Sequence, residues 1–76
     1  MQRKKTYIRN DTKLKTFGKR VRTLRQSKGH TMRQFADLCD IEYSQISRIE
    51  RGLINTSLSN VFIIAEVLEV DTKELF

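Results

Sequence analysis

Residues 31–52 read TMRQFADLCDIEYSQISRIERG, and this stretch decides the fold. Thr31 and Gln34 stand at capping-box spacing, in which each side chain bonds to a free backbone N–H group at a helix start, so a helix of about two turns is predicted from Met32. The apolar residues that we expect it to bury are Met32, Phe35, Ala36, Leu38 and Cys39.

After a short turn at Asp40 and Ile41, a second helix is predicted that ends near Gly52. Only Ile46 and Ile49 are available on it for burial. The opposite face, at about 100° per residue, carries Tyr43, Ser44, Ser47, Arg48 and Arg51. Packing requires none of these side chains, so this helix is either an ordinary exposed helix or one that presents its polar face to a partner.

The two helices and the turn between them have the dimensions of a helix-turn-helix. Ala36 favours this interpretation, because a methyl side chain on the inner face of the first helix lets the second approach closely, although alanine is also common in helices generally. In such a motif the second helix enters the major groove of DNA, where arginine bonds guanine through two hydrogen bonds.

The flanking sequence predicts three more helices. Leu14, Phe17, Val21 and Leu24 recur at helical spacing before Gly29. Ser57 is a good N-cap for the apolar run at 58–68, and residues 71–74 repeat a capping pattern before the chain reaches its last residues. No run alternates with period two, so the fold class is all-α: a compact five-helix bundle at 14–76, preceded by a basic N-terminal arm at 1–13.

Composition narrows the function classes. The chain has 76 residues and a net charge of +6, with +10 in residues 1–30 and −4 in residues 31–76, so the basic half favours a polyanionic partner. A single cysteine excludes an internal disulfide, and no apolar run approaches the length of a membrane span. These features are typical of a cytoplasmic protein with one small core.

Arg25 should lie at the edge of the buried stripe of the helix that begins near Leu14, where a charge needs an opposite partner. Glu50, which flanks Ile46, is the candidate, so we predict an Arg25–Glu50 ion pair that orients the polar helix; the alternative is that both are solvated. His30 is expected to pack on Phe35, and Cys39 to be a small buried residue. No set of catalytic groups appears, so we expect no enzyme, metal, cofactor or small-molecule substrate.

The segments ISRIERG at 46–52 and AEVLEVDTKELF at 65–76, with the KG step at 28–29, closely resemble the phage-repressor and Cro-like helix-turn-helix family, also called XRE-like. The resemblance covers residues 14–76. It implies a lambda repressor-like domain of five helices that binds operator DNA, usually as a dimer, and regulates transcription. A protein-binding module with the same fold, such as an antitoxin or adaptor, is the alternative.

The same resemblance implies the site residues. The base-contacting residues would be Tyr43, Ser44 and Arg48, with Gln45 and Ser47 at the margins. The phosphate-contacting residues would be Thr31, Met32, Arg33, Arg51 and Asn55. Three departures stand out: Met32 replaces a common glutamine, Glu42 replaces the usual Ser or Thr cap of the polar helix, and Thr56 replaces a frequent proline.

Self-association is predicted from excess apolar surface at the C-terminal end. The residues of this expected dimer interface are Ile63, Val67, Val70 and Phe76. A homodimer would place two polar helices about one duplex turn apart, on a palindromic operator. Alternatively, the arm at 1–13 covers this surface. The arm could also follow the DNA backbone, enter the minor groove or remain a disordered, solubilising tail.

Overall fold

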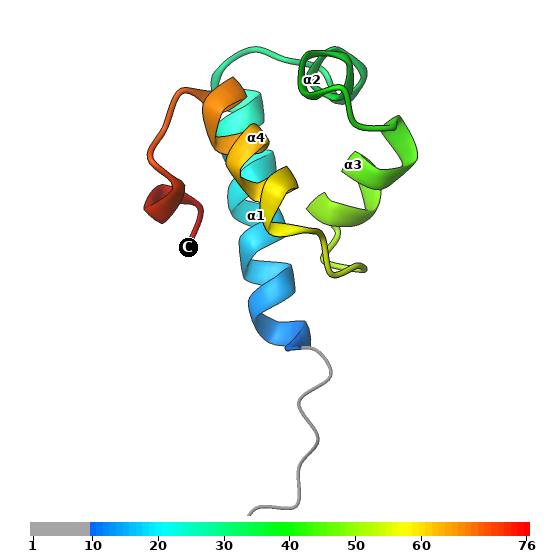
Figure 1. Cartoon of the computed structure of the whole chain (residues 1–76), viewed down its shortest axis with the longest axis vertical. Coiled ribbons are helices and arrows are strands. Elements are labelled where there is room, and N and C mark those ends of the chain that lie inside the picture. The colour runs from blue at the N-terminus through cyan, green and yellow to red at the C-terminus, as the bar shows by residue number, and fades with distance from the viewer. Residues whose placement is uncertain (1–9) are drawn as a thin grey trace, which may run out of the picture.

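The computed structural model of the chain describes residues 10–76, which fold into helices without a strand in that range. The elements are α1 (Asp11–Ser27), α2 (Met32–Cys39), α3 (Tyr43–Glu50), α4 (Leu58–Leu68) and a 3-10 helix, η1 (Thr72–Leu75). α1 and α4 lie side by side, with α2 and α3 on one side of this pair and η1 on the other (Figure 1). The predicted all-α class is therefore confirmed.

The helix boundaries predicted from caps and glycines are confirmed at one end of each of the four α-helices. The Thr31 hydroxyl accepts the Gln34 N–H at 3.0 Å, and the Gln34 side-chain oxygen accepts the Thr31 N–H at 2.9 Å. Ser57 caps α4 in the same way, accepting the N–H of Asn60 at 3.1 Å. Gly29 and Gly52 follow α1 and α3 with φ of 81° and 71°, a left-handed conformation that glycine adopts at little cost.

The first helix begins earlier than the expected start at Leu14. Asn10 caps α1, because its side-chain oxygen accepts the backbone N–H of Lys13 at 3.0 Å, and the first helical residue is Asp11. Residues 11–13, which were assigned to the basic arm, therefore form the first turn of α1. The other arm residues, 1–9, lie outside the part of the chain that the structure describes.

Two further expectations were wrong in detail. The fifth helix is a single 3-10 turn, because its four residues leave room for i to i+3 bonds such as Glu74 N–H to Asp71 O at 2.9 Å. Leu38 is exposed, not buried. At about 100° per residue, it points about 100° from Cys39 and about 60° from Phe35, away from the centre of the face that α2 turns to the core.

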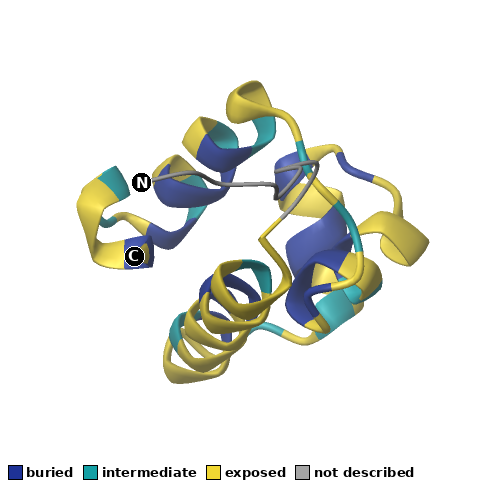
Figure 2. Cartoon of the chain, turned by 90° about the horizontal axis from the view of Figure 1, so that it is seen from below, coloured by how far each residue is buried: buried dark blue, intermediate teal, exposed yellow. Residues whose placement is uncertain are grey.

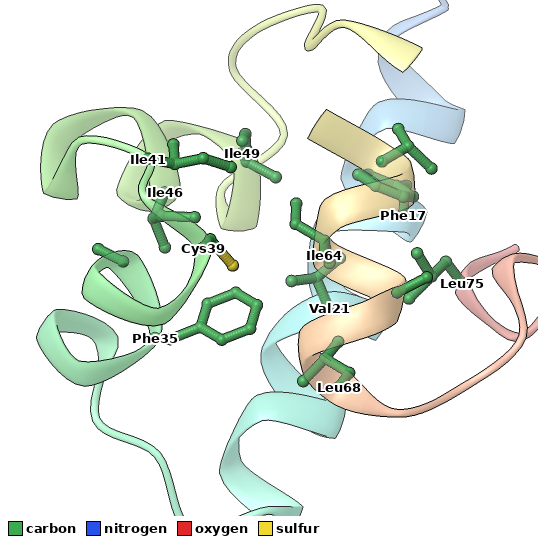
Figure 3. Close-up of a cluster of buried hydrophobic side chains, with 13 residues drawn as sticks. Phe17, Val21, Phe35, Cys39, Ile41, Ile46, Ile49, Ile64, Leu68 and Leu75 are labelled. Carbon is green, nitrogen blue, oxygen red and sulfur yellow. The ribbon is translucent and has the colours of Figure 1, made fainter. Parts of the chain in front are cut away.

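The core lies between the α1–α4 pair and the α2–α3 pair. Phe35, Ile46 and Ile49 come from one pair, and Val21 and Ile64 come from the other (Figure 3). Seen from below, the buried parts of the helices face one another, and the exposed parts face outward (Figure 2). The helix-turn-helix therefore has a buried inner side and a solvent-facing outer side.

Candidate nucleic-acid interface

The outer face of α3 is polar and open to solvent. Tyr43, Ser44, Gln45 and Arg48 are exposed and Ser47 is half-buried, whereas Ile46, Ile49 and Glu50 are the buried residues of the helix. The two isoleucines thus hold α3 to the core, as their spacing predicted. The five residues that the family resemblance assigned to base contact are left on the outside, where they share one accessible surface.

α1 supports α3 from behind at unusually short range. A Cβ atom on the buried Gly18 would collide with the carbonyl oxygen of Ile49 and lie 2.7 Å from that of Glu50. At the next turn, a Cβ on Gly52 would lie 2.6 Å from the Cα of Lys15. Two glycines therefore let the backbones of α1 and of the end of α3 approach each other, which fixes the position of α3. No role was predicted for Gly18, although an isolated glycine inside a helical pattern can mark a close approach of another segment.

A buried ion pair adds a directional link between the same two helices. Arg25 Nε donates to Glu50 Oε2 at 2.7 Å, and Arg25 Nη2 donates to Glu50 Oε1 at 3.0 Å. Arg25 Nη1 donates to the carbonyl oxygen of His30 at 2.9 Å. The predicted ion pair is present, and its two parallel hydrogen bonds define the geometry of both side chains.

Some polar groups at the start of α2 already form hydrogen bonds within the protein, and others do not. The N–H of Thr31 and its hydroxyl oxygen are already used in the capping box. Met32 is half-buried and packs against the core, which leaves its side chain little part in a polar contact. The N–H groups of Met32 and Arg33, at the first two helical positions, have no carbonyl partner within the helix and point out along its axis.

The remaining residues of the expected phosphate-contacting set lie at the other end of α3. Arg51 is exposed, and its Nε donates to the carbonyl oxygen of Ser47 at 3.3 Å, so the side chain folds back along the helix while its terminal nitrogens remain accessible. Asn55 is exposed in the loop that follows and lines a hollow of about 260 Å³ beside Leu14 and Phe17. Cationic or amide donors thus flank α3 at both ends.

One contact at the site was not foreseen. The guanidinium carbon of Arg33 lies over the ring of Tyr43, 4.7 Å from its centroid. Glu42, the N-cap of α3, forms no side-chain capping bond, in line with the expectation that it is a poor cap. The start of α3 therefore lacks a side-chain cap. The ring of Tyr43, its first residue, is contacted by Arg33 of α2. The turn geometry was the signal, because it brings the first turns of both helices together.

The residues of the expected dimer interface occupy two environments. Ile63, Val67 and Val70 are half-buried and pack on the rim of the core. Phe76 is 75% exposed, and its ring stacks on Phe17 with the centroids 5.3 Å apart. Phe62, which was not predicted to belong to this interface, is 49% exposed on the outer side of α4 next to Ile63. α4 therefore presents more apolar surface to solvent than was expected.

The residues expected to be structural take structural positions. The rings of His30 and Phe35 stack with centroids 6.5 Å apart, and Cys39 is buried, where desolvation raises the pKa of its thiol to about 11. Within residues 10–76, no group of three His, Cys, Asp or Glu side chains could hold a metal ion. No helix in the same range is long and apolar enough to cross a membrane.

Comparison with known proteins identifies the class. The profile of the helix-turn-helix family HTH_3 matches residues 21–75, so the chain belongs to this family and is a DNA-binding transcription regulator. Its sequence is 42% identical over 60 residues to the control protein C.BamHI of Bacillus amyloliquefaciens, a match that spans 78% of this chain and 74% of that protein.

Two solved structures extend the comparison. The restriction-modification controller protein C.AhdI from Aeromonas hydrophila is similar with a TM-score of 0.83 and 37% identity, over 86% of this chain and 98% of the other. SinR, a master regulator for biofilm formation solved in complex with DNA, is similar with a TM-score of 0.74 and 30% identity, over 78% and 95% of the two chains.

Proposed function

We propose that this protein is a sequence-specific, non-enzymatic regulator that acts in the cytoplasm by placing α3 in the major groove of an operator duplex. The observation that carries the proposal is the outer face of α3: Tyr43, Ser44 and Arg48 are exposed although packing does not require them, and α1 holds their backbone rigidly. Residues that read bases discriminate best when their helix is already fixed before binding.

The two kinds of contact have separate positions in this proposal. Arg48 and the residues at the start of α3 contact base edges, whereas the start of α2, Arg51 and Asn55 contact phosphates on either side of the groove. Phosphate contacts position the protein, and base contacts determine the sequence that it prefers. The operator is palindromic, because two copies of the chain, joined through α4 and the C-terminal residues, present two symmetric α3 helices.

The relatives favour a particular regulatory role. The control protein C.BamHI and the restriction-modification controller C.AhdI are each similar to this chain over more than three quarters of its length. We therefore propose that the genes under control belong to a restriction-modification system. A promoter that carries the preferred operator, fused to a reporter gene, should respond to expression of this protein and not to the Arg48→Ala variant.

Selection from a random duplex pool tests the division of roles. Wild type should enrich one palindromic sequence, with an affinity that falls steeply with salt, by a slope of about −0.9 per phosphate neutralised. Arg48→Ala should lose about 1–3 kcal/mol at one base position, and Arg51→Ala should weaken all sequences about equally and reduce the slope by about 1. If both variants lower affinity uniformly, or wild type enriches nothing, the proposed function is wrong.

A further inference from the structure

The stacking of Arg33 on Tyr43 joins two residues that the proposed function gives to different tasks. Arg33 is the second residue of α2 and belongs to the phosphate-contacting set, whereas Tyr43 is the first residue of α3 and belongs to the base-contacting set. Their side chains meet across the turn, with the guanidinium carbon 4.7 Å from the ring centroid. A change at one of these positions therefore changes the surroundings of the other.

The surroundings of Arg33 show that this contact is selective. Three carboxylates, those of Asp37, Asp40 and Glu42, line the same surface depression as Arg33 and Tyr43. Among residues 10–76, the guanidinium of Arg33 forms an ion pair with none of them. Its guanidinium carbon lies over the ring instead, a position in which the planar group of arginine can stack on an aromatic face while its N–H edges remain free for hydrogen bonds.

The side chain of Tyr43 is only partly covered by the rest of the protein. It is 42% exposed, and the N-cap residue before it, Glu42, supplies no side-chain bond that would fix the first turn of α3. A phenol ring that rotates freely would lose rotamer freedom on binding and would meet its base in several poses. Arg33 covers one face of the ring in the unbound protein and so restricts this freedom.

We propose that Arg33 is a positioning residue that holds the ring of Tyr43 in its base-reading pose and so helps to set the preference at one operator position. The N–H edges of the same guanidinium, left free by the stacking, bond to the adjacent phosphate. Phosphate binding and base choice are thus coupled through one side chain. This inference rests on the proposed function, because it requires that α3 reads an operator.

The test compares variants in the random-pool selection and in salt titrations on the operator that wild type selects. Arg33→Ala should reduce discrimination at the position read by Tyr43 about two- to fivefold, the range expected for an exposed cation–π contact, in addition to lowering the salt slope. In a Tyr43→Ala background, adding Arg33→Ala should lower affinity without a further change in base preference. Lys73→Ala, which removes a charge on η1, is the matched control and should leave that preference unchanged.

Arg33→Lys separates charge from stacking. Lysine keeps the positive charge, so the salt slope should be retained, but it lacks the planar face, so part of the discrimination should still be lost. In the free protein, the NMR signals of the Arg33 Cδ protons should be shifted upfield by the ring in wild type and should return to ordinary values in Tyr43→Ala. Arg33 and Tyr43 are both exposed, so each variant should fold.

Three outcomes would overturn the inference while the proposed function stands. They are an Arg33→Ala variant that weakens all sequences equally, an Arg33→Lys variant that behaves like wild type at every operator position, and an effect of Arg33→Ala on base preference that persists without Tyr43. A wild type that selects no operator would overturn the proposed function itself, and this inference would fail with it.

Discussion

Gly18 lies where α1 passes the carbonyl end of α3, and it has no side chain to keep the two backbones apart. The same region contains the Arg25–Glu50 ion pair, so a few residues of α1 determine where α3 sits. Such a pair stabilises a fold little by itself, but removing one partner leaves a buried charge and is strongly unfavourable. At the scale of single residues, the interface on the outer face therefore depends on contacts behind it.

Gly18→Ala should lower the free energy of unfolding by about 1–3 kcal/mol, because the added methyl group forces α1 and α3 apart. The steric clash should outweigh the stabilisation of about 1 kcal/mol that alanine offers over glycine in a helix. Urea unfolding followed by circular dichroism measures the change. Lys19→Ala, at the exposed neighbouring position, should stay within about 0.5 kcal/mol of wild type. A Gly18→Ala variant as stable as wild type would contradict the close packing of these helices.

Cys39 gives a prediction on pH, because burial raises the pKa of its thiol to about 11. In the unfolded chain the thiol has a pKa of about 8.5. Between these values the unfolded chain loses the proton while the folded protein keeps it, so rising pH favours unfolding. Below about pH 8.5 both states are protonated, and the contribution of Cys39 to stability is fully present.

The free energy of unfolding of wild type should therefore fall more steeply from pH 8.5 to 10.5 than that of Cys39→Ala. Urea titrations at several pH values measure both slopes, and their difference isolates Cys39 from the lysines and tyrosines that ionise in the same range. Equal slopes would show that the thiol is not desolvated.

The helices of the motif differ in how they begin. α2 starts with a complete capping box, whereas α3 starts at Glu42, whose side chain caps nothing. The backbone of Glu42, with φ of −58° and ψ of 142°, is non-helical, as an N-cap requires. The element that carries the candidate base-contacting residues is thus the one with the weaker start.

Glu42→Ser should stabilise the protein by about 0.5–1 kcal/mol, because a serine hydroxyl would accept an N–H of the first turn of α3. Thermal unfolding measures the gain. The reverse experiment, Thr31→Ala at the N-cap of α2, should cost about 1 kcal/mol and serves as the comparison. A Glu42→Ser variant with an unchanged or lower midpoint would show that the start of α3 is already satisfied.

Local signals explain how much of the structure the sequence predicted. α2, α3 and α4 were predicted because caps and apolar spacing are encoded within each segment. The start of α1 at Asp11 and the single turn of η1 were missed, because a polar N-terminal turn and a four-residue helix leave little periodicity. The outer face of α3 followed from the absence of apolar residues. The Arg33–Tyr43 contact and the close approach at Gly18 were not predicted, because each depends on how two helices pack against each other.

At the scale of the whole molecule, the arginines of α3 and the exposed apolar surface of α4 lie in different regions. Exposed Arg48 and Arg51 belong to α3 and the residue after it, whereas exposed Glu66, Glu69 and Glu74 belong to the end of α4 and to η1, across the molecule (Figure 1). The two arginines suit a duplex, although Asp37, Asp40 and Glu42 also place carboxylates beside α3. On the other side, Lys28 lies 3.8 Å from Glu69. The exposed apolar part of α4 lies apart from α3, where a second copy would not block it.

Phe62→Lys should therefore convert the proposed homodimer to a monomer, because a buried, unpaired ammonium group is costly at an interface. Sedimentation across a concentration series measures the association. The variant should bind a palindromic operator more weakly than wild type and a single half-site about equally. Leu38→Lys, at an exposed apolar position on α2, is the matched control and should remain dimeric. Dimers that persist in Phe62→Lys would place the interface elsewhere.

The division of labour within α3 bears on how such a regulator changes over evolution. The isoleucines and Glu50 hold the helix, and the side chains at 43, 44 and 48 are exposed. Replacing these outward residues alters little of the folding free energy, so new recognition preferences can accumulate without loss of the scaffold. A lineage can thus acquire a different target site by a few surface substitutions, and a designer can retarget the chain at the same positions.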